Sequence, residues 1–236
     1  MTEETEAIVV KGKLRKYYRK SRDERWYGGI ASAYCCGCNL RCVFCWSGFP
    51  RDHPEKIGEF YGPEQVFNQL KEVAARSGYS QVRVTGNEPT IGRDHLLELL
   101  ELVDQSNLQF ILETNGILIG HDRHYADQLS KFSNLHVRVS LKATNPEQFS
   151  RLTGATPTAF DLQIEALKNL GDAEVSFHPA IMMSFSSSVD IQQLMNRLQT
   201  IGQNLTSSLE KEYVILYPPV VERLKKTGIK PLSSTP

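Results

Sequence analysis

The stretch Gly37-Cys38-Asn39-Leu40-Arg41-Cys42-Val43-Phe44-Cys45 holds three cysteines in the spacing C-x₃-C-x₂-C. Thiolates this close together in sequence typically bind zinc or an iron–sulfur cluster. A closed structural site commonly uses four protein ligands, one more than this stretch supplies. On a four-iron cluster, three thiolates leave one iron without a protein ligand. The spacing therefore favours a metal centre with one open position.

All five cysteines of the 236-residue chain lie between Cys35 and Cys45. A secreted disulfide framework spreads its cysteines to join distant segments, so metal binding in a reducing compartment is the better interpretation. Residues 1–6 are acidic and do not resemble a secretory signal. No stretch approaches the roughly 20 apolar residues of a membrane helix. We therefore expect a cytoplasmic protein that does not enter a membrane.

Basic and acidic residues balance at 27 each, which argues against broad nucleic-acid binding. Residues 11–25 nevertheless form a basic stretch interleaved with aromatic residues. That stretch is either a solvated arm packed on the domain or an arm that grips an anionic or macromolecular partner. We expect an N-terminal extension over residues 1–28, one domain over residues 29–224, and a frayed polar tail over residues 225–236.

Strand and helix patterns alternate from residue 30 onward. The expected strands span residues 30–35, 81–85, 108–114, 135–141, 173–177 and 213–217. The expected helices begin at Pro63, after Asp94, after His121, at a capping box of Thr158 and Asp161, and after Ser188. Such alternation predicts a parallel sheet with right-handed crossovers. Six units rather than eight indicate an α/β fold with a partial (β/α)₆ barrel.

Polar residues recur at every second position of several expected strands. His136, Arg138, Ser140 and Lys142 share one face of the fourth strand, because successive side chains alternate between faces. Similar rows are Gln81, Arg83 and Thr85, and Glu174, Ser176 and His178. Parallel strands covered by helices are normally apolar on both faces. Three polar rows therefore indicate a hydrophilic lumen, although a single row also fits a half-exposed edge strand.

Two short turns follow expected strands directly. Gly86-Asn87-Glu88-Pro89 comes after the second strand, and Thr114-Asn115-Gly116 ends the third. Active sites of such sheets lie at the carboxyl ends of the strands. Glycine allows close backbone approach to a ligand, and proline fixes the exit of the loop. Each turn alone is also typical of an ordinary connection.

Taken together, these motifs resemble the radical S-adenosylmethionine (SAM) superfamily. Cys38, Cys42 and Cys45 match its C-x₃-C-x-aromatic-C motif, with Phe44 as the aromatic residue. The run Gly86–Pro89 is similar to its G-G-E-P motif, with Asn87 replacing the second glycine. The resemblance covers roughly residues 30–219.

The resemblance implies a 4Fe–4S cluster held by the three cysteines, with SAM chelating the fourth iron. Reductive cleavage of SAM would then give a 5′-deoxyadenosyl radical that abstracts hydrogen from the substrate. The backbone of Gly86, Asn87, Glu88 and Pro89 would bind the methionyl amine, and Glu88 would help shape that loop. The backbone around Phe44 would contact adenine. An electron donor such as flavodoxin or ferredoxin would reduce the cluster.

Within the superfamily, the chain looks most similar to glycyl-radical activating enzymes such as pyruvate formate-lyase-activating enzyme. Their T-N-G turn matches Thr114-Asn115-Gly116, which adds Thr114 and Asn115 to the expected cofactor site. Ser140 and Lys142 become candidates for binding the SAM ribose and carboxylate, and Lys142 joins the cysteines as a catalytic candidate. His178 resembles a residue of the cofactor pocket that comes later in the sequences of this subfamily. The resemblance to this subfamily also implies that the substrate is a protein.

Several features depart from that subfamily and leave alternatives open. The chain has no cysteines for a second cluster domain, and residues 46–51 lack the usual His-Asn continuation. A small-molecule enzyme similar to 7-carboxy-7-deazaguanine synthase is one alternative, although its N-terminal S-x-Q-G-E-G segment is absent. RNA modification is another. Outside the class stands a non-enzymatic iron–sulfur or zinc module, with Cys35, Cys36 or His53 as a fourth ligand. If they are not ligands, Cys35 and Cys36 are interpreted as small buried residues that end a strand.

Overall fold

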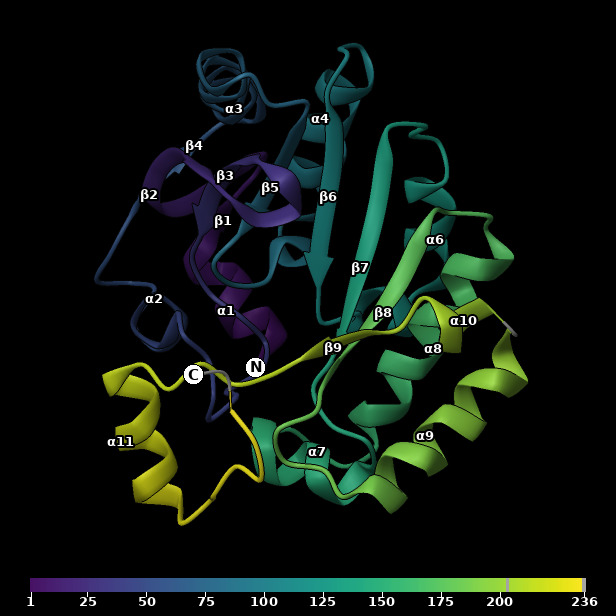
Figure 1. The fold of residues 1–236 in the computed structure, drawn as a ribbon. Coiled ribbons are helices and arrows are strands. Elements are labelled where there is room, and N and C mark those ends of the chain that lie inside the picture. The colour runs from purple at the N-terminus through teal and green to yellow at the C-terminus, as the bar shows by residue number, and fades with distance from the viewer. Residues whose placement is uncertain (203, 235–236) are drawn as a thin grey trace.

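The computed structural model describes residues 1–202 and 204–234, and it shows one mixed sheet with helices packed on its outer face (Figure 1). Its strands are β1 (Val10–Lys11), β2 (Leu14–Glu24), β3 (Ile30–Cys35), β4 (Glu59–Tyr61), β5 (Gln81–Thr85), β6 (Gln109–Thr114), β7 (Leu135–Leu141), β8 (Phe177–Met182) and β9 (Glu210–Glu212). Its helices are α1 (Thr2–Val9), α2 (Gly48–Asp52), α3 (Pro63–Ser77), α4 (Arg93–Asp104), α5 (Ile117–His121), α6 (Arg123–Leu129), α7 (Pro146–Thr153), α8 (Ala159–Asp172), α9 (Ser188–Ile201), α10 (Asn204–Ser207) and α11 (Pro218–Thr227). No helix in this part of the chain combines the length and apolar character of a membrane span.

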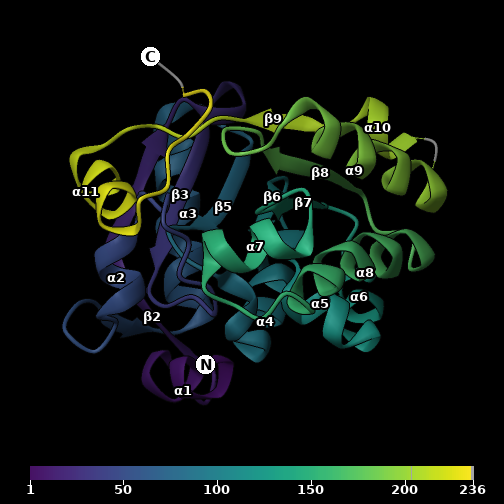
Figure 2. The ribbon, with the colours of Figure 1, turned by 90° about the horizontal axis from the view of Figure 1, so that it is seen from below.

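The six strands β3, β5, β6, β7, β8 and β9 pair in parallel in that order. The sheet curves without closing, which confirms the expected partial barrel. Seen from below, helices α4, α6 and α8 lie on the convex side of the strands (Figure 2). All parallel strands end at the lower edge in Figure 1, where the cysteine loop also lies. The strand ends and this loop therefore share one edge of the sheet.

The residues before β3 extend the sheet rather than forming a free arm. Strand β2 pairs antiparallel with β3 and carries most of the basic stretch. Arg15 and Lys16 on this strand are buried, so part of the stretch contributes to the interior. After α11, the backbone N–H of Leu232 donates to the Ser184 carbonyl at 2.6 Å. The division into residues 1–28, 29–224 and 225–236 stays a prediction.

Four of the six predicted parallel strands match the structure within one residue, whereas the last two do not. Helix α8 continues to Asp172 and Glu174 adopts a left-handed turn, so the strand predicted over residues 173–177 begins only at Phe177. The strand predicted over residues 213–217 lies at residues 210–212 instead. The apolar residues that suggested it, including Ile215, Leu216 and Tyr217, are exposed on the segment leading to α11.

Two predicted helix starts also need correction. Thr158 makes no side-chain cap at the start of α8. Helix α9 is capped by Ser187, whose hydroxyl accepts from the Asp190 backbone N–H at 3.2 Å, rather than by Ser188. By contrast, α3 begins at Pro63 as predicted. The cap of α8 is thus absent and that of α9 lies one position earlier than predicted, but the predicted segments are helical in both cases.

A buried histidine makes the fold sensitive to acid. His95 on α4 is 2% exposed, with Nε2 2.8 Å from the Tyr17 hydroxyl and Nδ1 2.9 Å from the Lys13 carbonyl. Burial lowers the pKa of His95 to about 4, below the value of about 6.5 expected in the unfolded chain. The unfolded state therefore binds a proton first, and stability present above pH 6.5 is lost as the pH falls toward 4.

We expect His95 to account for about 2–3 kcal/mol of the stability lost between pH 7 and pH 4.5. Urea unfolding of the protein and of His95→Gln at both pH values measures this. Glutamine retains a donor and an acceptor for the Lys13 carbonyl and the Tyr17 hydroxyl, so the variant should lose less stability on acidification. An identical pH dependence in both proteins would contradict the assignment to His95.

Candidate functional site

The three motif cysteines lie on the loop between β3 and α2, directly after the end of β3. Cys42 is buried and Cys38 and Cys45 are partly buried, and all three thiols are free. Burial raises the pKa of the Cys42 thiol to about 11, and burial together with the Glu88 charge also raises the pKa of Cys38. Because metals bind the thiolate form, ligation would release these protons.

Two arginines that the sequence analysis did not single out support this loop. Arg51 Nη1 donates to the Cys42 carbonyl at 2.5 Å. Arg223 on α11 donates through Nε to the Val43 carbonyl at 3.1 Å and through Nη2 to the Cys45 carbonyl. The guanidinium groups thus satisfy loop carbonyls that have no strand or helix partner. They also place two positive charges beside the three thiols.

The Asn87 side chain connects the turn after β5 to both ends of the cysteine loop. Its Oδ1 accepts from the Gly37 N–H at 2.9 Å, one residue before Cys38. Its Nδ2 donates to the Ser47 carbonyl at 3.1 Å, two residues after Cys45, and to the Gly86 carbonyl at 2.8 Å. The asparagine that departs from the G-G-E-P pattern is therefore a structural tie across the loop.

Gly86 cannot carry a side chain without displacing its neighbours. Its φ is +93°, and a Cβ there would lie 2.8 Å from a ring carbon of Tyr18. On the other side of this turn, Arg15 from β2 donates to the carbonyls of Cys36 and Glu88 at 2.6 and 3.2 Å. The cysteine loop and the Gly86–Pro89 turn are thus held together by Asn87 and Arg15.

Glu88 is 2% exposed and joins the turn after β5 to the turn after β6. Its Oε1 accepts from the Thr90 N–H and hydroxyl at 3.2 and 2.7 Å and from the Thr114 hydroxyl at 2.7 Å. Its Oε2 accepts from the Asn115 N–H at 2.8 Å. Glu88 therefore ties these two turns together, and its role in shaping the SAM-binding loop stays a prediction. Thr114 acts here as a partner of Glu88.

Asn115 reaches from the end of β6 to the first cysteine. Its Nδ2 donates to Asn39 Oδ1 at 2.7 Å and lies 3.8 Å from Cys38 Sγ. The Leu40 N–H also approaches Cys38 Sγ, at 3.4 Å. N–H groups around a cysteine sulfur stabilise its ligating, negatively charged form. Asn39 Nδ2 is buried beside them without an acceptor.

Ser140 and Lys142 lie at the end of β7 and face the short edge strand β9. Lys142 Nζ donates to the Ser140 hydroxyl at 2.6 Å, which donates to Glu212 Oε2 at 2.9 Å. Burial alone would raise the pKa of Glu212, but the charges of Arg138 and Lys142 lower it. The Lys142 charge also acts on the Cys42 thiol. Lys142 therefore lies within electrostatic range of the cysteine loop.

His178 lies farther from the cysteines, at the second position of β8. Its Nδ1 is 2.7 Å from His136 Nε2, and its Nε2 is 3.1 Å from Glu210 Oε2. Arg138 binds Glu210 through two nitrogens at 2.7 and 2.8 Å. Hydrogen bonds from Arg138 and His178 lower the pKa of Glu210 to about 2. The proposed cofactor role of His178 stays a prediction, since its contacts are with this charged group.

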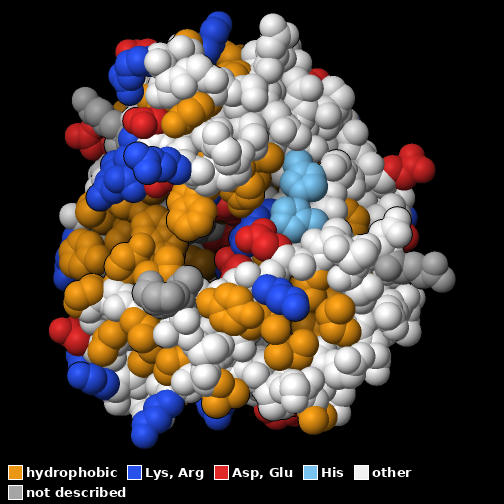
Figure 3. Space-filling model, viewed as in Figure 1, with side chains coloured by type: hydrophobic (Ala, Val, Ile, Leu, Met, Phe, Trp, Pro, Cys, Tyr) orange, Lys and Arg blue, Asp and Glu red, His pale blue; other side chains and the backbone are white. Residues whose placement is uncertain are grey.

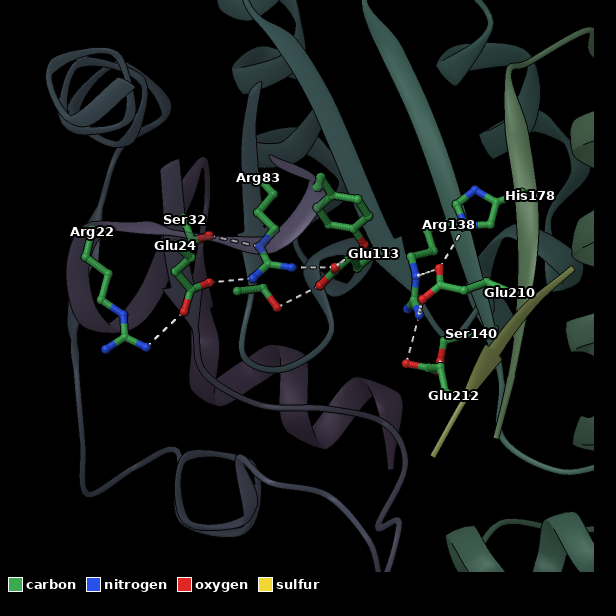
Figure 4. A network of polar contacts seen from close by, with 12 residues as sticks. Arg22, Glu24, Ser32, Arg83, Glu113, Arg138, Ser140, His178, Glu210 and Glu212 are labelled. Atoms are coloured by element: carbon green, nitrogen blue, oxygen red, sulfur yellow. Dashed lines mark hydrogen bonds and ion pairs between the residues drawn. The ribbon is translucent and has the colours of Figure 1, made fainter. Parts of the chain in front are cut away.

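A second charged group lies across the concave face, around Arg83 on β5. Arg83 donates to the Ser32 hydroxyl at 2.9 Å, to Glu113 at 2.5 Å and to Glu24. Figure 4 shows both groups on the same face, with Arg83 on β5, Arg138 on β7 and Glu113 on β6 between these strands. In the space-filling view, acidic and basic side chains occupy a hollow in this face, with histidine at its edge (Figure 3). The polar rows predicted on β5 and β7 therefore line a hydrophilic lumen, whereas the predicted row of Glu174, Ser176 and His178 does not form, because β8 begins only at Phe177.

The remaining predicted residues have separate neighbours. The Phe44 ring stacks on Phe185 with centroids 5.4 Å apart, which fixes the backbone at that point of the loop. Cys35 and Cys36 are fully buried, and Cys36 packs with Val9 and Ile91. This confirms that both are small core residues. The loop, the turns after β5 and β6 and the end of β7 thus converge, while His178 lies apart.

An open parallel α/β barrel with a three-cysteine loop at the carboxyl edge of its strands defines the class of fold and site. The family model of the radical SAM superfamily matches residues 33–198. The chain therefore belongs to the radical SAM superfamily, and it is an enzyme whose cofactors are a 4Fe–4S cluster and SAM.

Curated relatives include a probable GTP 3′,8-cyclase of Thermococcus kodakarensis, 24% identical over 208 residues. That match covers 82% of this chain and 64% of the relative. A GTP 3′,8-cyclase of Heliobacterium modesticaldum is 29% identical over 119 residues, which cover 49% of this chain and 34% of the relative. The chain thus spans less than two thirds of these relatives. They are named for a small-molecule substrate rather than for glycyl-radical activation.

Solved structures share the fold at low identity. The structure of anSMEcpe with bound AdoMet and a peptide aligns with a TM-score of 0.58 at 20% identity, over 79% of this chain and 51% of that one. A radical SAM methyltransferase from Sphaerobacter thermophilus gives a TM-score of 0.60 at 15% identity, over 85% and 64%. Both likenesses concern the fold alone.

The residues of the loop fit a sulfur-rich cluster. Three free thiols, N–H donors beside Cys38 and a buried donor without an acceptor at Asn39 are the surroundings that such a cluster needs. Within residues 1–202 and 204–234, no three His, Cys, Asp or Glu side chains are arranged around the position of a single metal ion.

Proposed function

We propose that this radical SAM enzyme abstracts hydrogen from a small polar molecule bound in the lumen of the partial barrel. The observation that carries this proposal is the pair of charged groups around Arg83 and Arg138 on the concave face (Figure 4). Such a lining matches a ligand rich in hydrogen-bond donors and acceptors. The names of the GTP 3′,8-cyclase relatives support the same class of substrate.

The residues take distinct roles in this proposal. Cys38, Cys42 and Cys45 hold the cluster, while the backbone of Gly86–Pro89 and the side chains of Ser140 and Lys142 bind SAM. Asn115 and Thr114 support this site through Asn39 and Glu88. The bound cofactors supply a one-electron cleavage that generates a hydrogen-abstracting radical. Radical SAM enzymes need an electron donor, for which flavodoxin or ferredoxin is our candidate.

Anaerobic reconstitution with iron and sulfide, followed by incubation with SAM and dithionite, tests the proposal. We expect 5′-deoxyadenosine to form slowly without substrate and faster with the correct small molecule. GTP is the first candidate, and deuterated substrate should transfer its label into 5′-deoxyadenosine. Failure to form any 5′-deoxyadenosine would refute the activity. Label transfer only from a protein or peptide would refute the small-molecule part.

A protein substrate, as in glycyl-radical activation, is a second candidate supported by one observation. Trp46 and Phe49 follow the last cysteine directly and are 52% and 56% exposed. Large exposed apolar side chains beside an active site are typical of protein-binding surfaces. Replacing both residues by serine should then reduce activity toward a protein substrate but leave turnover of a small molecule in the lumen unchanged.

Lys142→Ala should weaken SAM binding about tenfold while leaving cluster assembly intact. A hydrogen-bonded ion pair with a carboxylate contributes roughly 1.5–3 kcal/mol, and alanine removes the ammonium without touching the cysteines. SAM titration of the reconstituted protein, followed by EPR of the reduced cluster, measures the change. Lys168→Ala on α8 is a matched control, since Lys168 is exposed and forms an ion pair with Glu165. Unchanged SAM affinity in Lys142→Ala would refute the assignment.

A further inference from the structure

The Asn39 side chain follows the first cysteine and is 6% exposed. Its Nδ2 is buried and makes no hydrogen bond within the described residues. An unpaired buried amide donor costs roughly 1–3 kcal/mol, so native proteins rarely leave one without an acceptor. The position beside Cys38 raises the question of which acceptor this donor serves.

The orientation of the Asn39 amide follows from a chain of hydrogen bonds. The Ile117 backbone N–H can only donate, and it lies 3.0 Å from Asn115 Oδ1. Asn115 therefore presents its Nδ2 to Asn39, at 2.7 Å from Asn39 Oδ1. Asn39 must accept with that oxygen, which leaves its Nδ2 as the unpaired group. Exchanging the two atoms of Asn39 would place two donors 2.7 Å apart.

The surroundings of Asn39 indicate a sulfur acceptor. Cys38 Sγ already receives the Leu40 N–H at 3.4 Å and is approached by Asn115 Nδ2 at 3.8 Å. The same Sγ lies 3.8 Å from Asn39 Oδ1, so the amide and the thiol are neighbours. A cluster bound to Cys38 would bring further sulfur acceptors to this place, whereas the residues that the structure describes supply no acceptor for Asn39 Nδ2.

We propose that Asn39 is a positioning residue whose Nδ2 donates to a sulfur of the iron–sulfur cluster, with Asn115 fixing the amide in that orientation. Hydrogen bonds to cluster sulfurs stabilise the more negative, reduced state and raise the reduction potential. Asn39 thereby makes the cluster easier to reduce. The inference rests on Cys38, Cys42 and Cys45 being the cluster ligands, a part of the proposed function.

The test is an EPR-monitored redox titration of the reconstituted holoprotein without substrate. Asn39→Leu has a similar shape but no donor. We expect the ratio of reduced to oxidised cluster at a fixed potential to fall about tenfold, which corresponds to 59 mV for a one-electron couple. Asn39→Asp keeps an acceptor for Asn115 and adds negative charge, so its potential should fall further. Asn169→Leu, a buried asparagine bonded to the Ile119 carbonyl, is the control and should leave the potential unchanged.

Iron content separates the possible outcomes. Unchanged potentials in Asn39→Leu and Asn39→Asp at full iron content would overturn the role of Asn39 without affecting the cysteine assignment. If the variants do not assemble a cluster, wild-type protein labelled with ¹⁵N-asparagine provides the measurement. Because Asn115 Nδ2 also approaches Cys38 Sγ, pulsed EPR of the reduced cluster should detect hyperfine couplings to two asparagine nitrogens, and one coupling or none would overturn the proposal. Failure of the wild-type protein to bind iron would instead refute the cysteine assignment.

Discussion

Replacing Cys42 by alanine should abolish the cluster and, with it, SAM cleavage. Cys42 is the middle cysteine of the motif, and its thiol is free and buried. Removing partners outside the direct ligands typically costs 10–100-fold in metal affinity, so we expect losing a ligand to cost more than about 100-fold. Iron content, the visible absorption of the cluster and 5′-deoxyadenosine formation measure the effect.

Cys36→Ala is the matched control, because Cys36 lies two residues before the motif and is also buried. Its thiol donates to the Ile57 carbonyl at 3.6 Å and packs with Val9 and Ile91. We expect full iron content and a loss of about 1 kcal/mol in unfolding free energy. A cluster that persists in Cys42→Ala, or disappears in Cys36→Ala, would contradict the assignment of ligands.

Local pattern was sufficient to predict the central strands but not the outer ones. Residues 30–35, 81–85 and 135–141 combine regular alternation with burial, and each forms the strand predicted. The edge strand Glu210–Glu212 is short and charged, pairs in parallel with β8, and places Glu210 and Glu212 in ion pairs with Arg138 on β7. These ion pairs join residues 72 or more positions apart, so no local pattern reveals them.

In the candidate site too, local sequence predicts some features, whereas others depend on distant residues. Its motifs, from Cys38 to the turn at Asn115, were predicted from short runs of sequence. The residues that hold these motifs together were not, because their partners are distant: Arg15 contacts Glu88 73 residues away, and Arg223 contacts Cys45 178 residues away. The residues next to a buried arginine in the sequence do not indicate which distant groups it will contact. For Asn87 the family motif predicts a backbone role in binding SAM, but not the side-chain hydrogen bonds that tie the cysteine loop.

Glu88→Ala should destabilise the protein by about 4 kcal/mol or more. The carboxylate is the acceptor for four donors: the N–H and hydroxyl of Thr90, the hydroxyl of Thr114 and the N–H of Asn115. All of these residues are buried, so alanine leaves their donors unpaired and opens a cavity. Urea unfolding of the protein without cofactors measures this loss independently of SAM binding.

Glu88→Gln should lower the unfolding free energy by only about 1–3 kcal/mol, because the two carboxylate oxygens accept different numbers of hydrogen bonds. Oε1 accepts three of the four hydrogen bonds, and the glutamine oxygen can take that position. The amide nitrogen then faces the Asn115 N–H, where a single hydrogen bond is lost.

Glu101→Gln, on the exposed face of α4, is the control and should change stability by less than about 0.5 kcal/mol. Equal losses in Glu88→Gln and Glu88→Ala would show that this division of acceptors is wrong, since glutamine keeps the shape of glutamate and replaces only one of its two acceptor oxygens by an amide nitrogen. Because Asn115 is freed in both variants, its contact with Asn39 should loosen, and SAM binding should weaken in both.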